Sequence, residues 1–95
     1  MIIKFPAYIT FLSHDEGGKK HPPPSNTDYS CQLQLNNSLI NWSIVLNFVH
    51  AENERSGLGH VWFLMPDAPH EILSLYSEFG LAEGPHKVGS FKIIK

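Results

Sequence analysis

The chain contains a single cysteine, Cys31, which excludes an internal disulfide and a zinc site built from several cysteines. No apolar stretch approaches the roughly 20 residues that a membrane-spanning helix needs. The N-terminal segment MIIKFPAYITFL has an apolar core but neither a basic start nor a small-residue cleavage site, so we interpret it as a strand rather than a signal peptide. These features make the cytoplasm the expected location and Cys31 a small buried apolar side chain.

Basic residues are few as well. The 95 residues carry a formal net charge of −2, and the pI is near 6.3. Domains that bind nucleic acid through their overall charge are usually basic, so such binding here would need a local basic patch. The content of 42% hydrophobic and 17% charged residues is typical of a globular protein, and the length allows one domain, residues 1–95.

Sequence signatures of catalysis are also missing. No GxxxxGK(S/T) phosphate loop occurs, and the run Gly17–Lys20 leads into prolines rather than into a helix N-terminus, so we expect no GTP binding. No nucleophile elbow is visible, and we expect neither enzyme activity nor a cofactor. None of the six histidines belongs to a HExxH pattern, so scattered surface histidines explain their number and we expect no metal site.

Short segments in which apolar and polar side chains alternate make up much of the chain. A period of two is typical of half-buried strands, and in the first segment Ile3, Phe5, Ala7, Ile9 and Phe11 share one face. The segments that we predict as strands are residues 2–12, 29–35, 39–49, 60–65, 79–82 and 87–94. Pro6 donates no hydrogen bond, which predicts an edge or a bulge at that point of the first strand.

The connecting segments are rich in turn residues. Residues 13–27 form a long loop with two glycines and three consecutive prolines, and loops of this length are often functional. Asn36-Asn37 predicts the turn of a hairpin, and residues 50–59 predict a polar loop. Residues 70–77 fit either a short helical turn or an irregular crossing. The side chains expected to close one end of the molecule are Leu73, Leu75 and Tyr76.

Short strands separated by turns, without a convincing long helix, predict an all-β protein. A closed barrel is favoured because closure removes the strand edges that would otherwise pair with other chains. Trp42 and Trp62 are predicted as core or rim aromatics, although a tryptophan on the outer face would mark a partner surface.

Two motifs resemble a known family. The first is AYITFLSHDEGGK, Ala7 to Lys19, followed by Pro22, and the second is Phe79-x-x-x-Glu83-Gly84-x-x-x-Val88-Gly89. In order and spacing they resemble the first strand with its loop and the closing hairpin of the C-terminal β-barrel domain of translation elongation factor Tu and its eukaryotic relatives. The resemblance covers most of the chain, with little identity in the middle.

This resemblance implies a single six-stranded antiparallel Greek-key barrel without catalytic residues. In that family the domain packs against a GTPase domain and contacts the T stem of aminoacyl-tRNA through the loop after the first strand and the final hairpin turn. Carried over by position, the basic loop residues become Lys19 and Lys20, and the glutamate and glycine of the turn are kept as Glu83 and Gly84. The turn departs from the family at Pro85 and His86, which stand where the family has glycine and arginine.

The resemblance therefore predicts a surface that binds RNA or a component of the translation apparatus. Its residues are Gly17, Gly18, Lys19, Lys20 and His21 in the loop and Glu83, Gly84, His86 and Lys87 in the turn. A solvated loop whose glycines only turn the chain is the simpler reading. A second function is a protein-interaction or inhibitor module, for example an immunity protein against a secreted toxin. A continuous positive patch would favour RNA, and an exposed apolar patch rimmed by charge would favour a protein partner.

Overall fold

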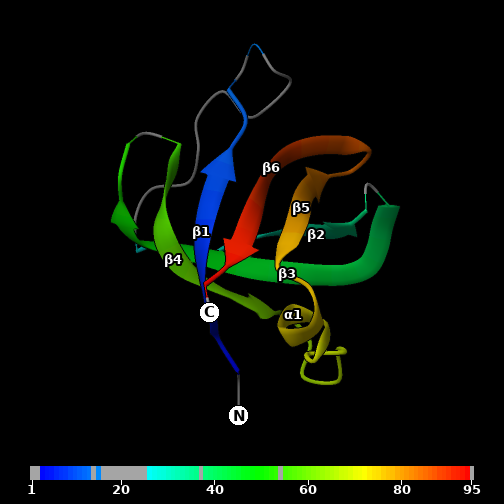
Figure 1. Cartoon of the computed structure of the whole chain (residues 1–95). Coiled ribbons are helices and arrows are strands. Elements are labelled where there is room, and N and C mark those ends of the chain that lie inside the picture. The colour runs from blue at the N-terminus through cyan, green and yellow to red at the C-terminus, as the bar shows by residue number, and fades with distance from the viewer. Residues whose placement is uncertain (1–2, 14, 16–25, 37, 54, 95) are drawn as a thin grey trace.

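The computed structural model describes residues 3–13, 15, 26–36, 38–53 and 55–94. Within these residues, strands form one closed barrel in the order β1-β4-β3-β2-β5-β6, with β6 pairing back to β1 (Figure 1). The elements are β1 (Phe5–Phe11), β2 (Tyr29–Leu35), β3 (Ser38–Ala51), β4 (Ser56–Phe63), α1 (Ile72–Leu75), β5 (Glu78–Glu83) and β6 (His86–Ile93).

Every neighbouring pair of strands is antiparallel. Strands β2, β3 and β4 follow one another around the barrel, β1 lies between β4 and β6, and the β5–β6 hairpin fills the remaining gap between β2 and β1. The prediction of a closed, six-stranded, antiparallel all-β barrel is confirmed. Because the barrel is closed, every strand pairs with a neighbouring strand on both sides.

The barrel interior is filled by the inward side chains of the strands, as the alternating pattern predicts. Ala7, Ile9 and Phe11 of β1 are buried, and Cys31 of β2 is 8% exposed, which confirms its predicted burial. The rings of Phe79 and Phe91 stack with their centroids 5.1 Å apart. The largest side chains that are fully buried are Phe11, Phe63, Ile9, Leu33, Ile44, Leu46, Leu73, Leu81 and Val61.

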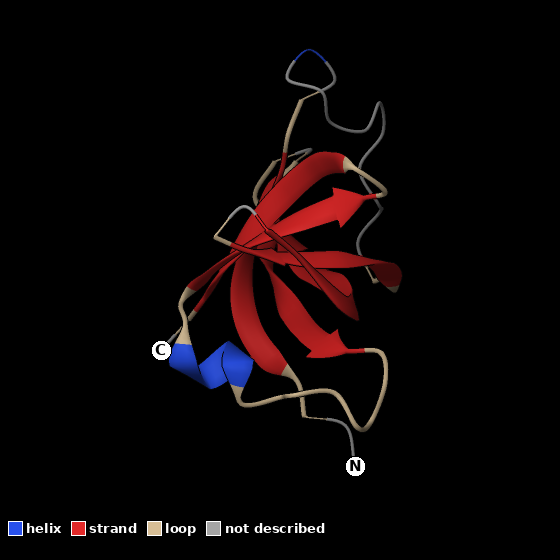
Figure 2. Cartoon of the chain, turned by 90° about the vertical axis from the view of Figure 1, so that its right-hand side faces the viewer, coloured by secondary structure: helices blue, strands red, loops and turns tan. Residues whose placement is uncertain are grey.

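The short helix α1 covers one mouth of the barrel, and the start of β1 and the end of β6 lie at that same end (Figure 2). We call it the helix-side end, and the opposite end, which carries the β5–β6 turn, the turn-side end. Leu73 is fully buried in the core, as predicted, and the helical reading of this segment is confirmed. Leu75 is 70% exposed and Tyr76 46%, so their predicted role in closing the barrel is wrong. One helical turn can direct only one of these side chains inward.

The third and fourth strands extend across most of the segment predicted as a polar loop, so that prediction is wrong. β3 continues to Ala51, and β4 begins at Ser56. The tight turn between them is held by the Asn53 side-chain oxygen, which accepts hydrogen bonds from the backbone N–H groups of Arg55 at 2.8 Å and Ser56 at 3.0 Å. The outward side chains at these strand ends face solvent and are polar. The segment therefore resembles a loop in the sequence.

The two tryptophans have different surroundings. Trp42 is partly buried and packs against the core, whereas Trp62 faces outward between the inward Val61 and Phe63 and is still only 6% exposed. The Lys4 ammonium covers Trp62 at 4.3 Å from the ring centroid. A cation over an aromatic face is stabilising, so Trp62 is a covered outer residue rather than an open partner surface. None of the helices in the described ranges is long and apolar enough to cross a membrane.

The barrel requires a side-chain-free position at Gly59, where a Cβ would overlap the backbone carbonyl oxygen of Asn47 on β3. We expect Gly59→Ala to lower the free energy of unfolding by about 2–3 kcal/mol, because the strands must move apart to admit the methyl group. Urea unfolding with an unchanged m-value measures this loss.

The control is Gly80→Ala in β5. An added Cβ at Gly80 meets the Gln34 side-chain oxygen at 2.7 Å, and because this end of a flexible side chain can turn aside, the loss should stay below about 1 kcal/mol. Equal losses at the two positions would contradict the close approach at Gly59.

Candidate binding surface

The predicted RNA surface is only partly within the described residues. Its loop half lies outside them, namely Gly17, Gly18, Lys19, Lys20 and His21. Its turn half is described and lies where β5 meets β6, with Glu83 paired to His86 and Ala82 paired to Lys87. Gly84 and Pro85 connect the two strands, and the positive φ of Gly84 fits a two-residue hairpin turn with glycine at its first central position. His86 and Lys87 are both exposed.

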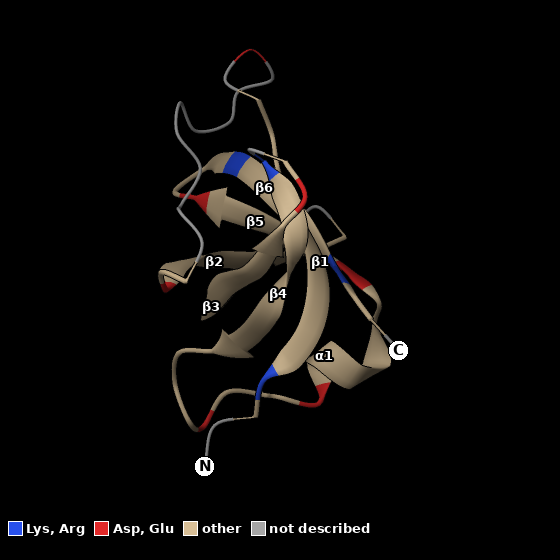
Figure 3. Ribbon diagram, turned by 90° about the vertical axis from the view of Figure 1, so that its left-hand side faces the viewer, with Lys and Arg blue, Asp and Glu red and all other residues tan. Residues whose placement is uncertain are grey.

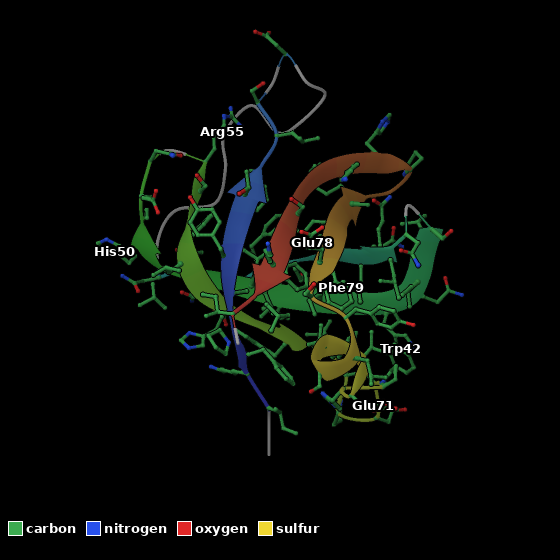
Figure 4. The ribbon with its side chains drawn as sticks, viewed as in Figure 1. Trp42, His50, Arg55, Glu71, Glu78 and Phe79 are labelled. Carbon is green, nitrogen blue, oxygen red and sulfur yellow. The ribbon has the colours of Figure 1, made fainter. Side chains whose placement is uncertain are left out.

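The point at which the long loop leaves β1 is held beside the beginning of β6. The Leu12 N–H donates to the Val88 carbonyl oxygen at 2.8 Å. The Arg55 guanidinium donates to the Leu12 carbonyl oxygen at 2.6 Å, so a cation is fixed at the same place. The end of β1, Arg55 and the β5–β6 turn all lie at the turn-side end (Figure 4). The start of the predicted loop and the predicted turn are therefore on one end of the barrel.

Glu83, one of the predicted site residues, is engaged inside the fold. Its carboxylate accepts a hydrogen bond from the Tyr29 hydroxyl, which joins the end of β5 to the start of β2. The Tyr29 ring also packs edge-on against Phe11, with the centroids 5.7 Å apart. Burial raises the pKa of Tyr29, and the hydrogen bond to Glu83 raises it further. The sequence analysis missed this pair, since two residues 54 positions apart show no signal of contact.

Charged residues of both signs are spread over the barrel rather than gathered on one face (Figure 3). Lys92 pairs with Glu78 at 3.7 Å, and both side chains are largely exposed. In the described ranges no group of three histidine, cysteine, aspartate or glutamate side chains is placed to hold a metal ion. Among the described residues, the basic side chains at the turn-side end are Arg55, His86 and Lys87, and Glu83 lies on the same hairpin as His86 and Lys87.

A groove of about 480 Å³ lies on the outer face of the barrel across β1, β6, β5 and β2. Its floor follows from the strand register, in which Gln34 pairs with Gly80, Gly80 with Ser90, and Ser90 with Thr10. Glycine and serine occupy the middle of this row, so little side-chain volume stands above the backbone there. Lys87, Lys92 and Tyr8 are among the larger side chains that line the groove. The sequence analysis missed the groove because the register that aligns these small residues is set by pairing across four strands.

The helix-side end has a different character. Several large apolar side chains there are between 44% and 70% exposed. They are Ile3, Leu64, Met65, Leu75, Tyr76 and Ile94. Apolar surface gathered around one end is typical of protein-interaction sites.

We expect Tyr29→Phe to lower the free energy of unfolding at pH 7 by about 1 kcal/mol, because it leaves the half-buried Glu83 carboxylate without this donor. The raised pKa of Tyr29 adds a pH dependence. Above pH 10 the unfolded chain loses the phenol proton while the folded chain keeps it, so the wild type loses stability as the pH rises and the variant loses less.

Urea unfolding between pH 7 and pH 11 tests both effects. Tyr76→Phe is the control, because Tyr76 is an exposed tyrosine that lies outside the pair of Tyr29 and Glu83. A Tyr29→Phe protein that matches the wild type at pH 7 and in its alkaline slope would show that the pair has no role in stability.

No protein-family model and no curated protein matches the sequence of the chain.

Proposed function

We propose that this chain is a non-catalytic, cytoplasmic binding module with a Greek-key barrel like the C-terminal domain of elongation factor Tu, and that it binds RNA at the turn-side end. The strand order supports the kinship, since β1 lies beside β4 after the consecutive strands β2, β3 and β4. The ligand that best fits the resemblance is a tRNA-like duplex stem.

One observation carries the proposal. The hydrogen bond between Leu12 and Val88 anchors the root of the loop with Lys19 and Lys20 next to the strand that presents His86 and Lys87. The Arg55 guanidinium sits on the same Leu12 carbonyl and adds a fixed positive group. Phosphate contacts from a few such cations bind nucleic acid with little sequence preference, and each contact adds to the salt dependence.

The geometry gives different roles to Glu83 and Gly84, the two turn positions that match the motif. Gly84 shapes the turn through its positive φ. His86 and Lys87 follow the turn directly, and both are exposed. Glu83 positions β5 against β2 through Tyr29 and does not need to face the RNA. The basic contacts in this proposal therefore come from Lys19, Lys20 and Lys87, together with the guanidinium of Arg55.

Replacing both loop lysines, as Lys19→Ala plus Lys20→Ala, should weaken binding of a tRNA about tenfold at low salt. The slope of log affinity against log salt should also fall by roughly one to two units, because up to two phosphate contacts are lost. Filter binding across a salt series measures both quantities.

The matched control, Lys4→Ala plus Lys92→Ala, removes the same charge from positions away from the turn. Lys4 lies over Trp62 and Lys92 pairs with Glu78. The control should change binding less than threefold. If the two double variants lose affinity equally, or if neither does, the turn-side end is not the RNA site.

The exposed apolar side chains at the helix-side end favour a second function, a protein-interaction or inhibitor module such as an immunity protein against a toxin. Leu75 and Met65 are the test positions, because they are 70% and 49% exposed and contribute little to the core. Leu58, 42% exposed on β4, provides the matched control.

A pull-down from native cell extract separates the two functions. Capture that disappears with nuclease supports RNA binding. Capture of a protein that survives nuclease, is lost in Leu75→Ser plus Met65→Ser and persists in Leu58→Ser supports the protein-interaction module instead.

A further inference from the structure

The groove across β1, β6, β5 and β2 is a product of how small side chains align, rather than a gap between loops. Gly80 and Ser90 are paired neighbours in the middle of the row that runs from Gln34 to Thr10. Below this floor lie the stacked rings of Phe79 and Phe91, so the backbone under the groove rests on packed core. A cavity of about 480 Å³ on such a support falls in the size range of small-ligand sites.

The polar groups around the groove are mostly hydrogen-bond donors or groups that can donate. Thr10 and Ser90 provide hydroxyls at the floor, and Gln34 provides an amide that is 9% exposed. A Cβ added at Gly80 would lie 2.7 Å from the Gln34 side-chain oxygen and 3.5 Å from the Lys87 Cε. The Gln34 amide and the Lys87 stem therefore both lie directly over the floor.

The charge in the groove is positive. Two lysines, Lys87 and Lys92, and one acid, Glu78, line it. Glu78 lies at the outer surface, beside the inward Phe79, and pairs with Lys92 at 3.7 Å (Figure 4). Lys87 forms no ion pair within the described parts of the chain. The groove thus offers one uncommitted ammonium group next to hydroxyl and amide donors.

We propose that this groove is a binding site for a small phosphate monoester, of the size of a nucleoside monophosphate. Lys87 and the hydroxyls of Ser90 and Thr10 hold the phosphate, and the half-buried Tyr8 on the β1 side gives aromatic surface to the rest of the ligand. A phosphate monoester suits these groups because its oxygens accept several hydrogen bonds and its charge matches a lysine. The proposal does not rest on RNA binding at the turn-side end.

The alternatives are less well matched. A planar carboxylate would be better held by an arginine fork, and no arginine lines the described part of the groove. A peptide strand cannot add to the sheet here, because the barrel is closed and the groove is on its face. The hydroxyl-and-lysine set therefore favours phosphate.

Titration of the whole chain, followed through the backbone amide signals of Gly80 and Ser90, tests this assignment. The probes are adenosine 5′-monophosphate, adenosine, inorganic phosphate and succinate. We expect saturable shifts at Gly80 and Ser90 with the monophosphate, at least tenfold weaker binding of adenosine, and no saturation with succinate. Adenosine or succinate binding as tightly as the monophosphate would overturn the assignment.

Variants locate the site. Lys87→Gln should weaken the monophosphate about tenfold, since it removes a charged hydrogen bond, and Ser90→Leu should abolish binding by filling the floor. Lys4→Gln is the matched control for charge, because Lys4 lies over Trp62, and it should change affinity less than twofold. Gly80→Ala, which places a methyl group against Gln34, is a second floor-filling variant if Ser90→Leu does not fold.

The loop variant Lys19→Ala plus Lys20→Ala separates this proposal from the previous one. Unchanged monophosphate binding by that variant supports the groove even if RNA binding fails. Loss of monophosphate binding in the loop variant, with normal binding by Lys87→Gln and Gly80→Ala, would overturn the groove as the site. A 5′-phosphorylated oligoribonucleotide that competes with the monophosphate would identify an RNA end as the source of the phosphate, and failure to compete would identify a free nucleotide.

Discussion

Closure of the barrel between β1 and β6 is the constraint on which the other features depend. The two strands pair from Ala7 with Ile93 to Phe11 with Gly89. At the last of these pairs the backbones approach so closely that a Cβ on Gly89 would lie 2.5 Å from the Thr10 carbonyl oxygen. A closed barrel with this few strands must be strongly coiled, and side-chain-free positions allow the coiling without steric overlap. Removing that freedom would open the seam and expose two strand edges at once.

Both candidate sites follow from this closure. The seam brings the end of β1 next to the start of β6, which places the root of the long loop beside His86 and Lys87. It also brings Thr10 into register with Ser90 and, through β5, with Gly80 and Gln34. An open sheet of the same strands would keep the β5–β6 turn but lose the fourth wall of the groove. The tie between Tyr29 and Glu83 then fixes β5 against β2 on the other side.

The sequence predicted most of the fold because alternation reports directly which side chains face a core. The β2 segment was predicted with its observed bounds. In the predicted face of the first strand Ala7, Ile9 and Phe11 are buried, whereas Ile3 lies before β1 begins and is 50% exposed. Alternation does not report how strands are paired, so the sequence predicts a loop at the joined ends of β3 and β4 and gives no sign of the row from Gln34 to Thr10. Register depends on the packing of the whole barrel, and no local pattern encodes it. The residues of the turn half could be named from the motif, whereas the bond that engages Glu83 could not.

Lys87 belongs to both proposed sites, and this has a thermodynamic consequence. Its stem lies over Gly80 in the groove, while its place one residue after His86 puts its charge near the turn. A phosphate bound in the groove would neutralise an ammonium group that RNA would otherwise contact, so the two ligands would weaken each other by the same factor. The coupling would grow as the ionic strength falls. In 0.1 M salt the screening length is about 10 Å, and at lower salt the negative charge of the bound phosphate acts over a longer distance. One lysine at the junction of a rim and a groove is sufficient for this antagonism, and no change in the shape of the barrel is needed.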